Sequence, residues 1–403
     1  MSTADTIAHA LEVPAPPPAD QPWLRQSLSD GPTGTALLHI ERAHTGHGTW
    51  PQAHNWIKAA TMTPVSASDT SGLFLGAPAV AFTLSCATAP DSARYRQALT
   101  AVDQHVTALA HRRVDTAIHR SGSGERPTFH EYDVFYGLTG IGAYLLRRHP
   151  GSSALERVLA YLVTLTRPVH DDRLGSVPGW WVGHDPSFTH SPGFPSGHAN
   201  LGVAHGITGP LLLMARALRH GVTVDGQADA IYTVLAWLDQ WRQEGAAGPR
   251  WPQHLTLDDL RTGRPTQSGP ARPSWCYGTP GIARAGQTAA IAVRDATRQH
   301  AYEEAMARCL TDPRQLARIA DTSLCHGWAG VYQTAWRAAR DAATPVLHAA
   351  LPPIADALNR HTPATAGRDP GLLLGDAGTA LALITAAGDA APASGWDACL
   401  LID

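Results

Sequence analysis

The sequence contains almost no lysine. Lys58 is the single lysine, so nearly all of the 31 basic residues among 403 are arginines. With 34 acidic residues, the formal net charge is only −3. No excess of positive charge is available to bind nucleic acid or an anionic membrane surface. The arginine bias, together with abundant alanine, is typical of a GC-rich genome.

Cysteine is also scarce, and the number of cysteines is odd. Five cysteines in a chain of this length cannot form the dense framework of a secreted disulfide protein. They favour a reducing cytoplasmic location, where grouped cysteines more often bind metal or react. Cys86, Cys309 and Cys399 lie among alanine or leucine residues and are predicted to be buried, unreactive thiols.

Long hydrophobic runs are missing. No segment reaches the roughly 20 apolar residues that span a bilayer. Residues 1–11 lack the basic and then apolar order of a secretory signal. We therefore predict a cytoplasmic protein without an integral membrane segment.

Strand-like alternation is rare, whereas apolar residues recur at helical spacing. This pattern predicts an all-α protein. The clearest predicted helical faces are Leu99, Val102, Val106 and Leu109; Leu155, Val158, Leu159 and Leu162; and Ile231, Val234, Leu235, Leu238 and Trp241.

Glycine-rich turns followed by small apolar residues recur every 50–70 residues or so. They lie at 72–76, 137–142, 202–209, 278–283, 327–331 and 371–378. This spacing allows a pair of helices per repeat, and such pairs must stack to bury both faces. If the turns gather at one end, closing the array gives an α/α toroid, a double ring of helical hairpins. An open solenoid of hairpins is the alternative.

We expect an extended, proline-rich N-terminal arm over residues 1–30 and a single toroid domain over residues 31–403. Long connections are predicted at 167–199 and 244–274. The first is long enough to form a lid over the mouth of the ring. Its aromatic and histidine side chains either line that lid or pack against the surface, and we assign them no role; they are Trp180, Trp181, His184, His190 and His198.

Two short strings, residues 275–281 and 325–330, are the most informative part of the sequence. They supply the thiols of Cys276 and Cys325 and the imidazole of His326, a ligand set that suits zinc. Three protein ligands leave a fourth position for substrate, as in catalytic rather than structural zinc sites. Spacing alone is weak support, because 49 residues separate the cysteines and neither belongs to a CxxC motif. Glycine directly after each motif lets both turns bring their side chains into one space.

These two strings and residues 200–210 resemble the three signature blocks of LanC-type lanthionine synthetases. The likeness in repeat pattern runs from about Gly72 to the end of the chain. It implies an α/α toroid with one Zn²⁺ per chain, held by Cys276, Cys325 and His326. It also implies the reaction: a cysteine thiol of a dehydrated precursor peptide adds to dehydroalanine or dehydrobutyrine, forming a lanthionine or methyllanthionine thioether.

The same resemblance implies that Asp133, His205, Arg272 and Tyr277 are the auxiliary catalytic residues. A histidine pKa can lie near working pH, so His205 is the candidate acid for the α-carbon, with Asp133 orienting its ring. Arg272 would stabilise the enolate or hold the Asp133–His205 pair. Tyr277 is either a weaker proton donor or part of the zinc surroundings. One turn departs from the family pattern, since Gly76-Ala77-Pro78-Ala79 lacks its second glycine.

Two alternatives remain. A LanC-like enzyme would add glutathione to dehydro residues with the same zinc, and a non-catalytic zinc-bearing scaffold would serve a peptide-modifying complex. The presence of Asp133, His205 and Arg272 favours chemistry. Because no dehydratase or kinase region precedes the toroid, we expect a separate dehydratase, working with the cyclase in a complex through which any membrane association would be made.

Overall fold

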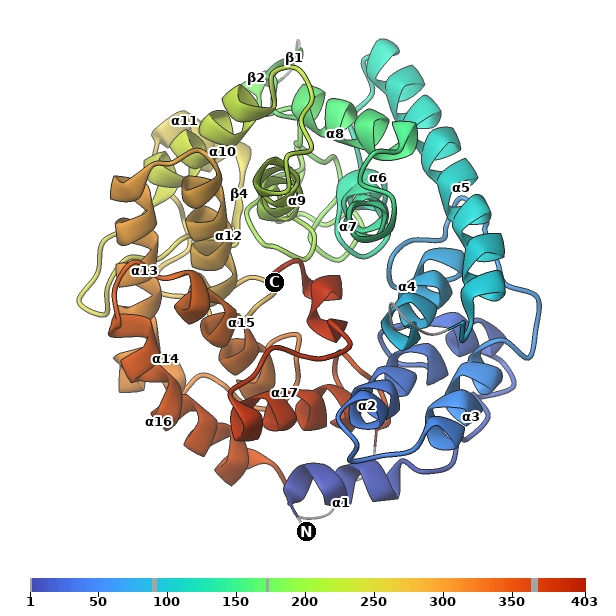
Figure 1. The fold of residues 1–403 in the computed structure, drawn as a ribbon. Coiled ribbons are helices and arrows are strands. Elements are labelled where there is room, and N and C mark those ends of the chain that lie inside the picture. Colours follow the sequence, from blue (N-terminus) through green and yellow to red (C-terminus); the bar gives the residue numbers. More distant parts are fainter. Residues whose placement is uncertain (1, 89–92, 172–173, 364–368) are drawn as a thin grey trace.

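The computed structural model describes residues 2–88, 93–171, 174–363 and 369–403. Over these ranges helices dominate, and every strand is only two or three residues long. Figure 1 shows the helices as two concentric rings around a central axis, with the chain passing round them from N- to C-terminus. The predicted all-α class and α/α toroid are confirmed.

The inner helices are buried on nearly all sides. Every residue of the inner helix α4 is buried, for example, which is why these segments are apolar all round. In the described part of the chain the inner ring consists of α2 (Pro32–His44), α4 (Ala77–Ala87), α7 (Leu138–Arg148), α9 (Thr208–Arg219), α12 (Thr279–Ala292), α15 (Trp328–Asp341) and α17 (Asp376–Gly388).

The outer helices each bury one face against an inner helix. The apolar faces predicted around residues 99–109, 155–162 and 231–241 are the buried faces of α5, α8 and α10. The outer ring consists of α1 (Thr3–Ala10), α3 (Trp50–Ala60), α5 (Arg96–Gly122), α8 (Ser153–Leu165), α10 (Gln227–Trp241), α13 (Ala296–Thr311) and α16 (Val346–His361).

Short elements fill the connections. They are η1 (Pro22–Gln26), α6 (Phe129–Tyr132), β1 (Val169–Asp171), β2 (Gly175–Val177), β3 (Ala199–Asn200), β4 (His254–Leu255), α11 (Leu257–Thr262), α14 (Pro313–Leu316) and η2 (Trp396–Leu400). The predicted connection 167–199 holds the β1–β2 hairpin, and β3 at its end pairs with β4 of the connection 244–274. The two long connections therefore meet. No helix in the described ranges combines the length and apolar character needed to cross a bilayer.

The ring closes between its last and first inner helices. Helix α17 packs against α2, and α1 packs on the outside of α17. In Figure 1 the red α17 lies beside the blue α1 and α2. The final hairpin thus combines helices from opposite ends of the sequence, which excludes the open solenoid.

The prediction of an extended arm over residues 1–30 is wrong for much of its length. Ser2 and Asp5 form a capping box that starts α1, and Ile7 on its buried face is 1% exposed. The prolines begin only at Pro14, so they do not interrupt this helix. Because α1 completes the outer ring, these residues belong to the toroid.

A seventh glycine turn, Gly31-Pro32-Thr33-Gly34, begins α2 and was missed in the sequence. The ring therefore closes between this turn and Gly375–Gly378, both of which keep two glycines. The turn that lacks its second glycine, at Ala79, is the second of seven in the described chain and lies away from the closure.

The seven turns are joined in a closed circle of backbone hydrogen bonds. The links run from Leu28 N to Phe74 O (3.0 Å), Phe74 N to Phe135 O (3.3 Å), Val134 N to Ala204 O (3.2 Å), Val203 N to Cys276 O (2.8 Å), Cys276 N to Cys325 O (3.2 Å), Cys325 N to Leu373 O (3.0 Å) and Leu373 N to Ser29 O (3.0 Å). These residues lie two or three positions before the glycine that opens the Gly-x-x-Gly stretch of each turn (Gly-x-x-Ala at Gly76), which we call its first glycine. These glycines are Gly31, Gly76, Gly137, Gly206, Gly278, Gly327 and Gly375. The circle therefore places equivalent residues of neighbouring turns side by side.

Candidate functional site

The site is built from equivalent positions in neighbouring turns. Cys276 and Cys325 each lie two residues before the first glycine, and the hydrogen bond from Cys276 N to Cys325 O joins them directly. His205, Tyr277 and His326 each lie one residue before that glycine. Sequence positions far apart are thereby gathered at one end of the inner ring.

Three donor atoms form a compact cluster. The Sγ atoms of Cys276 and Cys325 and a ring nitrogen of His326 all lie within 4.8 Å of one another. Cys276 is buried, whereas Cys325 and His326 are partly exposed. Among the described residues this is the one group of histidine, cysteine and acidic side chains with the geometry to hold a metal ion.

The cluster stabilises negative charge on sulfur. A hydrogen bond from Cys325, with a smaller contribution from His326, holds the pKa of Cys276 well below that of an ordinary thiol. The hydrogen bond with the Cys276 sulfur, followed by burial, raises the pKa of Cys325. Helices α12 and α15 begin just after these cysteines, and their N-terminal dipoles favour the same charge.

Asp321 orients His326. Its Oδ2 lies 3.3 Å from His326 Nε2, while its Oδ1 accepts hydrogen bonds from the backbone N–H and hydroxyl of Ser323. The Asp321 contact, followed by the Cys276 contact, raises the pKa of His326 to about 9. A carboxylate on the second ring nitrogen is typical of histidine metal ligands. Asp321 was missed because an acidic residue four positions before a cysteine has no distinctive sequence signal.

Asp133 and His205 form the second half of the site. The distance from His205 Nδ1 to Asp133 Oδ2 is 2.6 Å, and the Asp133 side chain is fully buried. Asp133 Oδ1 accepts hydrogen bonds from the backbone N–H groups of Tyr136 and Gly137 at 2.7 and 2.8 Å. One carboxylate thus caps its own turn and binds the imidazole of the next turn.

An aromatic wall surrounds His205. Its ring stacks on Phe129 and Phe135 at centroid distances of 5.4 and 5.0 Å. Phe188, from the connection predicted as a lid, meets the same ring edge-on at 5.4 Å. Phe188 has φ +63°, a strained conformation for a bulky residue. This contact could not be predicted, because a lone phenylalanine in a polar loop carries no periodic pattern.

Tyr277 connects the two halves. Its ring lies 6.3 Å from that of His205, and it follows Cys276 in the chain. Burial is the largest cause that raises the pKa of Tyr277, so its hydroxyl stays protonated. Arg272 lies on the cysteine side, with Nη1 3.9 Å from Asp321 Oδ2. The described ion pair of Arg272 is therefore with Asp321 rather than with Asp133.

Four of the five aromatic and histidine residues singled out in the connection 167–199 lie in the packed interior. Trp180 and Trp181 are each 1% exposed and belong to the hydrophobic core, so they do not line a lid. Burial lowers the pKa of His198 to about 3, which keeps this side chain neutral. His184 is also buried, whereas His190 is exposed.

The remaining cysteines are buried, as predicted. Burial raises the pKa of Cys86 to about 11 and that of Cys309 to about 12. Cys399 is also fully buried. None of the three belongs to the metal-compatible cluster found in the described residues.

Comparisons with known proteins identify the family and the fold of this chain. The family model described as lanthionine synthetase C-like protein matches residues 22–401. The nisin biosynthesis protein NisC of Lactococcus lactis subsp. lactis is 23% identical over 272 residues, which cover 66% of this chain and only 61% of that protein. The solved structure of nisin cyclase has a TM-score of 0.79 at 19% identity, with 94% of this chain and 93% of that chain covered. Since the family model spans nearly the whole sequence, this chain belongs to the lanthionine synthetase C-like family.

Proposed function

We propose that this protein is a zinc-dependent lanthipeptide cyclase that adds cysteine thiols of a dehydrated precursor peptide to dehydroalanine or dehydrobutyrine. The observation that carries this proposal is the placement of a two-thiol, one-imidazole cluster beside a carboxylate–histidine pair at one mouth of the ring. A scaffold needs no proton donor next to its metal.

The donor set fits one zinc ion, with Cys276, Cys325 and His326 as ligands. Because the carboxylate of Asp321 contacts Nε2 of His326, the other ring nitrogen, Nδ1, is the one that would bind the metal. When bound, zinc supplies the Lewis acidity that lowers the pKa of a substrate thiol and holds its sulfur as a nucleophile at neutral pH.

The protein's own residues manage the proton. As the substrate sulfur bonds to the β-carbon of the dehydro residue, the π electrons move toward the adjacent carbonyl and form an enolate. His205, positioned by Asp133, donates a proton to the α-carbon, which completes the thioether. The thiol proton lost at the start balances the one gained.

Arg272 and Tyr277 act around this step. The guanidinium of Arg272 adds positive charge on the cysteine side and holds Asp321, the residue that orients His326. The Tyr277 hydroxyl, kept protonated by burial, is hydrogen-bonded to Asn200, and its ring lies beside that of His205. We assign both residues to substrate positioning and charge stabilisation.

The substrate is a precursor peptide whose serine and threonine residues have already lost water. A separate dehydratase must supply it, and both enzymes would work in the cytoplasm, in one complex. Phe188, the partly exposed member of the aromatic wall around His205, offers such a peptide an apolar contact, whereas Phe129 and Phe135 are buried.

The first experiment measures zinc per chain and ring formation for wild type, Cys276→Ala and Cys325→Ala. Cys309→Ala is the matched control, because Cys309 is buried but lies outside the cluster. We expect about one zinc in wild type and the control, with neither zinc nor cyclisation in the two cluster variants. Cyclisation by a zinc-free cluster variant would contradict the proposal.

A second assay separates the substrate classes. Wild type is given a dehydrated peptide with its own cysteines, and in parallel a cysteine-free dehydrated peptide with glutathione. Ring formation in the first and no adduct in the second supports a cyclase. The reverse result would assign the protein to glutathione addition, and zinc with no turnover in either would leave a scaffold.

A further inference from the structure

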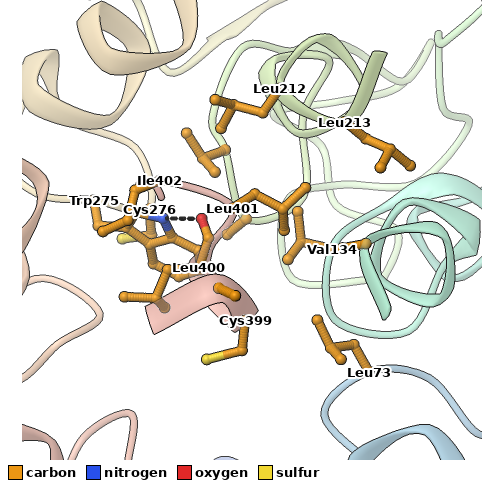
Figure 2. Close-up of a cluster of buried hydrophobic side chains, with 14 of the residues drawn as sticks. Leu73, Val134, Leu212, Leu213, Trp275, Cys276, Cys399, Leu400, Leu401 and Ile402 are labelled. Carbon is orange, nitrogen blue, oxygen red and sulfur yellow. Dashed lines mark hydrogen bonds between the residues drawn. The ribbon is translucent and has the colours of Figure 1, made fainter. Parts of the chain in front are cut away.

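The centre of the ring is filled by the C-terminal segment, residues 396–402. Figure 1 shows the red η2 and the chain after it inside the inner helices. Leu400, Leu401 and Ile402 have no exposed surface, and Figure 2 shows them among Leu73, Val134 and Leu212 of the surrounding turns and helices. The segment is therefore part of the core of the toroid.

Polar anchors fix this segment at both ends. The buried carboxylate of Asp397 accepts two hydrogen bonds from Arg337, at 2.6 and 2.7 Å, and one from Gln333 at 2.7 Å. Arg284, which is 1% exposed, donates from Nε to the carbonyl of Ile402 at 2.9 Å. Paired in this way, the buried charges hold the segment in one position.

Leu401 between these anchors is strained. Its φ is +59°, the left-handed region, which costs a leucine roughly 1–2 kcal/mol. A buried leucine keeps this conformation only where its surroundings determine it. The left-handed conformation of Leu401 turns the chain directly after Leu400. The carbonyl of Leu400 accepts a hydrogen bond from Trp275, next to the candidate metal site.

Leu400 contacts the candidate metal site through Trp275. The indole Nε1 of Trp275 donates to the Leu400 carbonyl at 3.0 Å, drawn as the dashed line in Figure 2. Trp275 is fully buried and directly precedes Cys276. Its ring also packs on that of Phe135, with the ring centroids 6.0 Å apart, and Phe135 in turn stacks on His205. The indole of Trp275 therefore lies next to Cys276 in the chain and also packs on Phe135, which stacks on His205.

We propose that the C-terminal segment is a positioning element of the active site, and that the Leu400–Trp275 hydrogen bond holds the turn of Cys276 in the geometry that binds metal. Trp275 is its positioning residue. This inference rests on the proposed function, because it takes Cys276 to be a metal ligand.

The test compares Trp275→Phe with Trp251→Phe. Trp251 is also buried and donates its Nε1 hydrogen to a backbone carbonyl, that of Leu238 at 2.8 Å, but it packs on Tyr302 in the outer part of the fold. Each variant is assayed for Co²⁺ affinity by competition with a chelator, for the visible spectrum of bound Co²⁺, and for zinc content and thermal stability.

We expect Trp275→Phe to weaken Co²⁺ binding roughly tenfold or more and to shift the Co²⁺ spectrum, because residues that support metal ligands have effects of about this size. Trp251→Phe should lower thermal stability with affinity and spectrum unchanged. Equal affinity and spectra for Trp275→Phe and wild type would overturn the inference.

Should Trp275→Phe not fold, Asp397→Asn loosens the segment from its far anchor without touching the turn. The same direction of change in affinity and spectrum is expected, and no change overturns the inference. Failure of wild type itself to bind Co²⁺ or Zn²⁺ would instead refute the proposed function.

Discussion

Asp133 shows how one residue difference within a repeated turn provides a carboxylate oxygen that binds a histidine. In three other turns the residue four positions before the first glycine is a serine, whose hydroxyl accepts the N–H three residues later; these are Ser27, Ser274 and Ser323. Asp133 makes the same cap with Oδ1. Its second oxygen is left over for His205.

Because Asp133 is equivalent to these serines, the variant Asp133→Ser tests whether its contact with His205 is needed for cyclisation. The serine can keep the cap, as its counterparts do, but it cannot reach His205. We expect normal zinc content and near-normal stability, with cyclisation slowed by about 10²-fold or more, since a positioned acid contributes 10²–10⁴. Rates are measured on the dehydrated peptide, with Asp133→Asn as a second variant that keeps the side-chain size. Wild-type rates in both would remove Asp133 from the mechanism.

At the residue scale, the sequence predicted the groups that stand next to glycine turns. Cys276, Cys325, His326 and His205 were recognisable because these residues and the glycines beside them resemble the signature blocks of a known family, whereas their spacing alone was weak support. The supporting residues Asp321 and Phe188 were not, because their contacts depend on side chains brought together by the fold. The role of Leu400 depends on a contact across 125 residues and has no local signal at all.

At the scale of elements, the second glycine of the two turns that carry the cluster cysteines allows a close backbone approach. A Cβ on Gly330 would lie 1.9 Å from the Leu324 carbonyl oxygen, and one on Gly281 would lie equally close to that of Trp275. In both turns the crowded carbonyl belongs to the residue just before a cluster cysteine. Glycine at these positions therefore lets the inner helix start tightly against the site.

Gly330→Ala is expected to destabilise the protein by about 1–3 kcal/mol and to weaken zinc binding, because Leu324 and Cys325 must move. Gly388→Ala is the matched control: it lies in α17, where an added Cβ meets nothing within 4 Å, and should change stability by no more than about 1 kcal/mol. Denaturant melts and zinc content provide the readouts. Identical behaviour of the two variants would contradict the close-approach explanation.

Helix positions were predictable because apolar periodicity marks long amphipathic segments. The outer helices α5, α8 and α10 followed this rule. The short helix α1 was missed since neighbouring prolines dominated the composition of the N-terminal region, although they lie outside it. Pairing of β3 with β4 joins two irregular connections, which no local pattern can indicate.

At the scale of the whole molecule, stability depends on closure. Helix α1 packs on α17, so the first residues of the chain complete its last hairpin. Two side-chain hydrogen bonds to the backbone extend this closure, since the Leu11 carbonyl accepts from the imidazole of His39 at 2.7 Å and from the indole of Trp56 at 3.0 Å.

We expect Ile7→Ala to destabilise the whole ring by about 2–4 kcal/mol, because it empties a buried position at the closure. Val13→Ala, at a residue 79% exposed, is the control and should be neutral. Unfolding is followed by circular dichroism and by tryptophan fluorescence, which should report one shared transition. If the Ile7 variant lost only α1, with the main transition unshifted, closure would not contribute to global stability.

The closed circle of backbone hydrogen bonds has an evolutionary consequence. An open array of repeats can gain or lose a unit and still stack, because only its ends change. Here Leu373 must meet Ser29 and Cys276 must meet Cys325, so duplication or deletion of one hairpin would leave a ring of the wrong circumference. We therefore expect change in length to be confined to the connections between helices, while the number of hairpins stays fixed.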